Sequence, residues 1–314
     1  MRSHHRYLLY LVGLGLFSLL IWHYEPGLIL EKLGTMSWQW VLLAGICILG
    51  VGIIGAVNVF LLVARDHKLT LTDFLPLYWA SWAVGLIVPG QIGDLASIGY
   101  LLRRHSLSLS KILGRAVLDK AISLIVMFGF VIVGLLVFVK GLNVAQNWLL
   151  GFVVLFLLGG GTVYLLMKSR WRHVFDVGNP GLGGAFTRIL REFVQTVRHA
   201  PSRVLLNVGL TVAKVTVTGI AYWAMFNALG ETELPVLRVV VLATSAGLIA
   251  YLPISINGLG TVEAAGIFLF GQAGIGATTV ISAYIGLRIL VLGIAWVPTL
   301  GWWMQGTRKA GSLT

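Results

Sequence analysis

The stretch GLIAYLPISINGLGTVEAAGIFLF, residues 247–270, decides the fold of this chain. It is an apolar segment whose middle contains four residues that disfavour a continuous helix: Pro253, Asn257, Gly258 and Gly260. Proline removes a backbone donor and glycine adopts conformations outside the helix, so we expect two half-helices joined by an irregular turn. An acidic residue, Glu263, opens the second half. Irregular backbone at membrane depth is tolerated only where protein or a water-filled cavity surrounds it, so the stretch predicts an intramembrane site.

The composition places the rest of the chain in a membrane as well. Of the 314 residues, 58% are hydrophobic and 11% are charged, with a mean hydropathy of +0.91. A helix needs about 20 apolar residues to cross a bilayer. Eight apolar segments are present, at 7–22, 38–64, 75–102, 116–139, 148–167, 204–229, 236–273 and 277–303. We therefore predict an all-α polytopic protein of the cytoplasmic (inner) membrane, with residues 1–314 forming one membrane domain.

The distribution of basic residues predicts which segments cross. The net charge is +12, but the bases lie at the ends of apolar segments, which favours membrane orientation over nucleic-acid binding. Arg2 and Arg6 place the N-terminus in the cytoplasm. If segment 75–102 crossed, the basic cluster at residues 103–115 would lie outside, whereas a re-entrant hairpin keeps it inside. We predict about six full spans, two broken hairpins at 75–102 and 236–273, and both termini inside; the second hairpin could equally be two spans.

The two hairpins form an internal repeat. VGLIVPGQIGDLASIGYLL, residues 84–102, has the same order of features as 247–270. Its break contains Pro89, Gly90 and Gly93, and Asp94 opens the next half-helix. Asp94 precedes Lys120 by 26 residues, and Glu263 precedes Arg288 by 25. We predict inverted repeats at 38–139 and 204–303, joined by a cytoplasmic connector at 168–203 with an amphipathic helix at 181–198.

Apart from Arg238, at the start of segment 236–273, six charged residues fall inside the apolar segments: Asp94, Asp119, Lys120, Lys214, Glu263 and Arg288. Each costs about 3 kcal/mol at the centre of a membrane helix unless it is paired, hydrated or functional. We therefore predict that they bind substrate, together with the half-helix N-termini, whose free N–H groups suit a phosphate. The prolines and glycines of the breaks, with Asn257, would shape that pocket.

Structural explanations compete for each of these residues. Asp94 and Glu263 could only stabilise helix N-termini, and the breaks could be packing kinks. Lys214 could extend to the membrane surface. Asp119 and Lys120 could form a solvated couple near the cytoplasmic end of their helix. Asn58, in the middle of an apolar segment, favours a hydrogen bond between helices.

Four motifs resemble those of a known family. They are LIVPGQIGD (86–94) with RAVLDK (115–120), and LPISINGLGTVE (252–263) with YIGLR (284–288). They are similar to the paired motifs of the lysylphosphatidylglycerol synthase transmembrane-region family, which includes the flippase module of the multiple peptide resistance factor. The resemblance extends from about residue 40 to residue 303, although Asp119 and Lys120 replace the usual acid–arginine couple. It implies translocation of a lipid with a charged headgroup, and, because no soluble synthase domain follows, no synthase activity.

We therefore expect a lipid flippase that moves an anionic or aminoacylated phospholipid, or a polyprenyl phosphate, across the membrane. The alternatives are an ion- or proton-coupled transporter and an accessory protein of a membrane-embedded lipid-phosphate transferase. No D-x-D, D-D or H-E-x-x-H pattern is present and Cys47 is the single cysteine, so we expect neither an enzyme, a metal nor a cofactor. Expected partners are membrane lipids, with a homo-oligomer or a separate lipid-modifying enzyme left open, and no nucleic acid.

The predicted sidedness can be tested with single cysteines in a Cys47→Ala background. A cysteine replacing Ser106 should react with a membrane-impermeant maleimide only after the cells are permeabilised, because the hairpin returns residue 106 to the cytoplasm. A cysteine replacing Glu233, in a loop predicted to lie outside, should react in intact cells and serves as the control. Labelling at position 106 in intact cells would show that segment 75–102 crosses the membrane.

Overall fold

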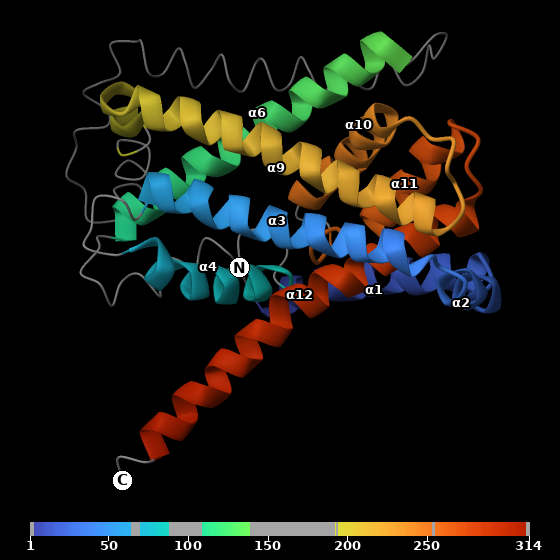
Figure 1. Cartoon of the computed structure of the whole chain (residues 1–314), viewed down its shortest axis with the longest axis horizontal. Helices are drawn as coiled ribbons and strands as arrows, with labels where there is room; N and C mark the ends of the chain where they lie inside the picture. The colour runs from blue at the N-terminus through green and yellow to red at the C-terminus, as the bar shows by residue number, and fades with distance from the viewer. Residues whose placement is uncertain are drawn as a thin grey trace.

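A computed structural model describes residues 3–63, 70–87, 109–138, 192, 194–252 and 255–311 (Figure 1). Its elements in these ranges are helices, and residues 194–199 are helical too. They are α1 (Ser3–His23), α2 (Pro26–Gly34), α3 (Trp38–Val63), α4 (Leu71–Gly85), α6 (Leu109–Phe138), α9 (Pro201–Ala228), α10 (Val236–Gly247), the 3-10 turn η2 (Leu248–Tyr251), α11 (Thr261–Gly271) and α12 (Ala277–Gly311).

Three of the described helices contain stretches long and apolar enough to cross a membrane. These stretches are Trp38–Leu62 in α3, Pro201–Ala228 in α9 and Ala277–Trp302 in α12. A fourth crossing is obtained if α1 and α2, which meet at 83°, count as one bent span. The chain is thus an all-α membrane protein, as predicted. The number of six spans and the sidedness stay predictions, and segment 148–167 lies outside the described residues.

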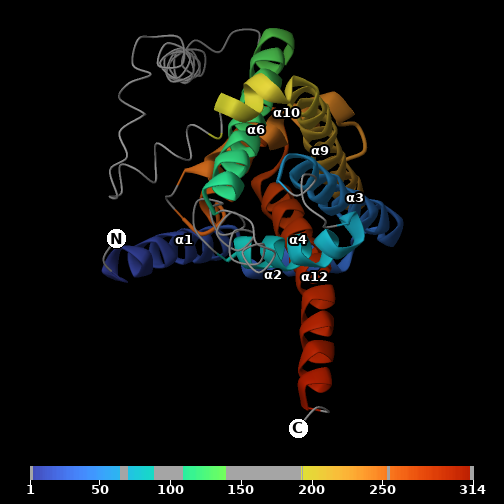
Figure 2. The ribbon, with the colours of Figure 1, turned by 90° about the vertical axis from the view of Figure 1, so that its left-hand side faces the viewer.

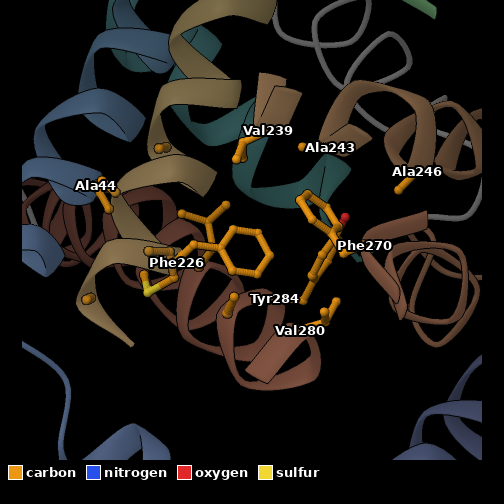
Figure 3. Close-up of a cluster of buried hydrophobic side chains, with 14 of the residues drawn as sticks. Ala44, Phe226, Val239, Ala243, Ala246, Phe270, Val280 and Tyr284 are labelled. Atoms are coloured by element: carbon orange, nitrogen blue, oxygen red, sulfur yellow. The ribbon is translucent and has the colours of Figure 1, made fainter. Parts of the chain in front are cut away.

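Helices α3 and α9 lie side by side along the middle of the bundle, and the other helices pack around them (Figure 1). Helix α10 packs against both α6 and α9, while α12 contacts α3, α4, α9 and α11. The C-terminal part of α12 projects beyond the bundle (Figure 2). Phe226 of α9, Phe270 of α11 and Tyr284 of α12 meet in the main apolar core (Figure 3). This core brings the second predicted repeat together.

The break predicted in segment 236–273 is present in the structure. Helix α10 tightens into η2, which ends at Tyr251, and α11 begins only at Thr261. Between them Asn257, Gly258 and Gly260 adopt φ angles of 45°, 71° and 78°. Glycine has no Cβ and accepts this left-handed conformation without strain, which explains the glycines of the motif. Pro253 lies outside the described residues, as do the corresponding residues of the first hairpin: Pro89, Gly90, Gly93 and Asp94.

Two helices begin or end where the hydropathy pattern does not place them. Helix α2 was not predicted, and α6 begins at Leu109 rather than at residue 116. Polar residues such as Ser110 and Lys111 continue the helix, although they lower the local hydropathy. Asp119 therefore lies about three turns inside α6 and is 3% exposed, so it is not a solvated residue at a helix end. Of the amphipathic helix predicted at 181–198, residues 192 and 194–198 are described and helical, and Val197 packs on the α6–α9 cluster.

The contact between α9 and α10 gives a test of this packing. A Cβ at Gly219 would lie 2.6 Å from the backbone Cα of Val240, so we expect Gly219→Ala to lower the free energy of unfolding by about 1–3 kcal/mol through overpacking. Gly209→Ala in the same helix, where a Cβ would meet no atom of the described residues within 4 Å, is the control and should be neutral or slightly stabilising. Thermal unfolding of the two purified variants would measure the difference. Equal stability would contradict the close approach of α9 and α10.

Candidate functional site

A cavity of about 320 Å³ lies among the broken segment and the helices around it. Its wall is built from α3, α4, α6, α9, α10, η2, α11 and α12. Four of the charged residues predicted from the sequence line it: Lys120, Lys214, Glu263 and Arg288. These residues are far apart in the sequence, and the fold brings them to one internal space. Asn257, in the break, lines the cavity too.

Glu263 and Arg288 form an ion pair across the start of α11. The Arg288 Nε and Nη2 atoms donate to Oε1 of Glu263 at 3.0 Å and 2.5 Å. The second carboxylate oxygen, Oε2, accepts the backbone N–H of Gly260 at 2.7 Å. Glu263 is fully buried, whereas the Arg288 side chain is 23% exposed. The carboxylate thus caps the half-helix and pairs with the base 25 residues later, so both of its oxygens are bonded inside the protein.

The two lysines bring further positive charge to the cavity from the middle of their helices. Lys214 is at the midpoint of the 28-residue helix α9, and no described residue forms an ion pair with it. Lys120, three residues before Ser123 on α6, lines the same cavity. Among the described lining residues, three basic side chains therefore accompany the single carboxylate of Glu263. Such an excess of positive charge in an internal cavity favours an anionic ligand.

Hydroxyl groups add a second feature that the sequence reasoning did not identify. Tyr284 and Ser123 line the cavity and are 3% and 1% exposed, yet neither hydroxyl has a hydrogen-bond partner among the described residues. Tyr222, whose ring lies 4.8 Å from that of Tyr284, is another lining residue. A buried hydroxyl without a partner loses about 1–3 kcal/mol relative to water. These groups are therefore available to a polar ligand that enters the cavity.

Three further predicted residues, Gly258, Gly260 and Asp119, are described by the structure and lie outside the cavity wall. Gly258 and Gly260 form the turn before α11, and a Cβ at Gly260 would come within 2.9 Å of the Gly13 carbonyl oxygen of α1. Their role in the structure is to let the chain turn and let α1 approach. Asp119 is not among the residues that line the cavity; its carboxylate contacts Asn58 and Asn207 instead. In the part of the chain that the structure describes, no three His, Cys, Asp or Glu side chains are grouped so that they could hold a metal ion.

The fold and the cavity define a class: an all-α membrane protein with a cavity among its helices whose described charged residues are mainly basic. The sequence profile of the Lysylphosphatidylglycerol synthase TM region family matches residues 8–300. The chain belongs to this family, as its motifs predict. No curated protein and no solved structure matches the chain.

The ion pair can be tested by breaking it from one side. Arg288→Met leaves the carboxylate of Glu263 buried without its cation, so we expect a loss of about 3–5 kcal/mol in the free energy of unfolding. Adding Glu263→Gln should restore part of that loss, because the double variant no longer buries an unpaired charge. Arg238→Met, which removes a base outside the cavity, is the control. Chemical or thermal unfolding in detergent would measure the series; additive losses in the double variant would contradict the pairing.

Proposed function

We propose that this protein moves a lipid with a phosphate-bearing headgroup across the cytoplasmic membrane. The observation that carries the proposal is Lys214, a basic residue at the midpoint of an apolar helix that faces a cavity and has no ion-pair partner among the described residues. An unpaired ammonium at this depth is costly, and a phosphate would compensate it. Membership of a family named for lysylphosphatidylglycerol synthase supports a lipid as the bearer of that phosphate.

The arrangement of charge suits recognition of an anion that must later be released. Lys120, Lys214 and Arg288 surround the space from three different helices, so a phosphate could contact more than one of them at a time. The carboxylate of Glu263 lowers the net charge of the cavity and holds Arg288 in place. A transport site must bind its ligand with moderate affinity so that the ligand can be released. The acidic group among the basic groups lowers the affinity of this cavity for an anion.

The wider setting is part of the proposal. We place the protein in the cytoplasmic membrane as a transporter rather than an enzyme, with six spans and two hairpins that enter from opposite faces. The lipid is an anionic or aminoacylated phospholipid or a polyprenyl phosphate. A homo-oligomer or a separate lipid-modifying enzyme would be its protein partner. In such inverted repeats, substrate sites lie near the middle of the bilayer, which agrees with the mid-helix position of Lys214.

A translocation assay in proteoliposomes tests the proposal. Fluorescent phosphatidylglycerol, lysylphosphatidylglycerol and a polyprenyl phosphate would be followed from the inner to the outer leaflet. We expect the wild type to move at least one of them and Lys214→Met to move it at least about tenfold more slowly, since a hydrogen bond to a charged group contributes about 1.5–3 kcal/mol. Lys214→Arg, which keeps the charge, should retain most of the rate, and Arg238→Met should resemble the wild type.

Two results would remove the basis of the proposal. One is a wild type, folded and reconstituted, that moves none of these lipids. The other is a Lys214→Met variant that moves lipid as fast as the wild type. Ion or proton flux in the same vesicles without lipid movement would favour an ion-coupled transporter instead.

A further inference from the structure

A second buried polar cluster lies between α3, α6 and α9, outside the cavity wall. It consists of Asp119 from α6, Asn58 from α3, and Asn207 and Thr211 from α9. Oδ1 of Asp119 accepts Nδ2 of Asn58 at 3.1 Å and Nδ2 of Asn207 at 2.9 Å. The Asn58 amide nitrogen lies 3.0 Å from Oγ1 of Thr211. Asp119 is 3% exposed and the other three side chains are fully buried, so water does not compensate the carboxylate.

This cluster has two deficits. The first is charge: among the described residues, the partners of the Asp119 carboxylate are two neutral amides, and none forms an ion pair with it. The second is hydrogen bonding: the Oδ1 atoms of Asn58 and Asn207 are buried and have no hydrogen-bond partner in the part of the chain that the structure describes. The carboxylate lacks a counter-charge and the two amide oxygens lack a donor; a single cation compensates all three oxygens if the amides turn so that their oxygens, rather than their nitrogens, face the carboxylate.

Two basic residues flank Asp119 on its own helix, and both are directed elsewhere. Arg115, one turn earlier on α6, donates from Nη1 to the backbone carbonyl of Leu62 at 3.0 Å, at the end of α3. Lys120 lines the cavity. On α3 and α9, the described residues that hydrogen-bond to the Asp119 carboxylate are Asn58 and Asn207. Lys214 lies one turn beyond Thr211, on the cavity wall.

From these contacts we propose that Asp119, Asn58, Asn207 and Thr211 form a binding site for a monovalent alkali cation, Na⁺. A half-turn of each amide about its Cβ–Cγ bond exchanges its oxygen and nitrogen. The amide oxygens then lie where the nitrogens are now, about 3 Å from the carboxylate, and Thr211 adds a hydroxyl oxygen. Hard cations prefer such an oxygen set. One carboxylate balances one positive charge, which favours a monovalent ion over a divalent one.

The position of the cation site links it to the cavity. Lys120 follows Asp119 directly, and Lys214 follows Thr211 by one turn. A cation bound at Asp119 neutralises the carboxylate and raises the positive potential at both lysines, so it strengthens binding of an anion there. This consequence rests on the proposed function, whereas cation binding itself does not.

Binding of ²²Na⁺ to the purified full-length protein in detergent, without added lipid, tests the site. We expect saturable binding by the wild type, and Asp119→Asn, which keeps the shape of the side chain, should weaken it at least about tenfold, because it removes the only charged ligand. Thr211→Val should weaken binding to a smaller extent. Thr218→Val, two turns along the same helix with its hydroxyl bonded to the Lys214 carbonyl, is the matched control and should bind like the wild type.

Thermal unfolding in NaCl, KCl and choline chloride at equal ionic strength gives a second measurement that needs no variant. We expect the unfolding temperature to rise with NaCl concentration more than with choline chloride, because a ligand that binds only the folded state stabilises it. The proposal is overturned if folded wild type shows no saturable ²²Na⁺ binding, or if the Asp119→Asn variant binds ²²Na⁺ as well as the wild type does. It is also overturned if Ca²⁺ displaces bound ²²Na⁺ at lower concentrations than unlabelled Na⁺ does. Because no lipid is present, these experiments do not test lipid transport, which the proteoliposome assay tests separately.

Discussion

The ion pair between Glu263 and Arg288 is the interaction on which the described site depends. It joins the first turn of α11 to the middle of α12, and the same carboxylate accepts the N–H of Gly260 at the end of the break. A helix that starts inside a bundle leaves N–H groups and a positive dipole that need a partner. Glu263 provides that partner, and Arg288 provides its counter-charge. The interruption of the helix is therefore compatible with burial.

The break in turn makes the cavity. Because residues 255–260 are not helical, α10 and α11 are two short helices rather than one long span. Their ends leave room beside α6, α9 and α12, and the basic residues of those helices face this room. Small residues bring the surrounding helices close enough to form its walls: Gly219 lies against Val240, and Gly266 against the ring of Tyr284. The helices that form the cavity wall are thus closely packed against one another directly beside the cavity.

The polar residues of the bundle separate into two groups with different chemistry. The cavity collects bases together with hydroxyl groups, whereas Asp119 lies among amides and a threonine in the layer next to it. Adjacent residues of α6, Asp119 and Lys120, belong to different groups because a helix turns by about 100° per residue. The motif that contains them therefore does not behave as a single acid–base couple.

Much of the fold followed from local patterns. Hydropathy located α3, α9 and α12, and the Pro and Gly residues located the break before Thr261. The start of α6 and the presence of α2 could not be predicted from the hydropathy pattern, since polar residues can continue or form a helix when tertiary contacts stabilise it. Hydropathy also singled out Lys120, Lys214, Glu263 and Arg288 as costly residues. It could not identify Tyr284 or Ser123, because an aromatic or hydroxyl residue in an apolar run is unremarkable until its partners are known.

By itself, the sequence determined that this chain is a helical membrane protein, where one helix breaks, and which charged residues need compensation. These properties depend on the free energy of transfer of each residue and on local backbone preference, both of which act over a few residues. Only the tertiary structure decided that Glu263 pairs with Arg288, that two lysines share their cavity, and that Asp119 lies with Asn58 and Asn207. Those contacts join helices distant in the sequence, and their geometry depends on how the helices pack.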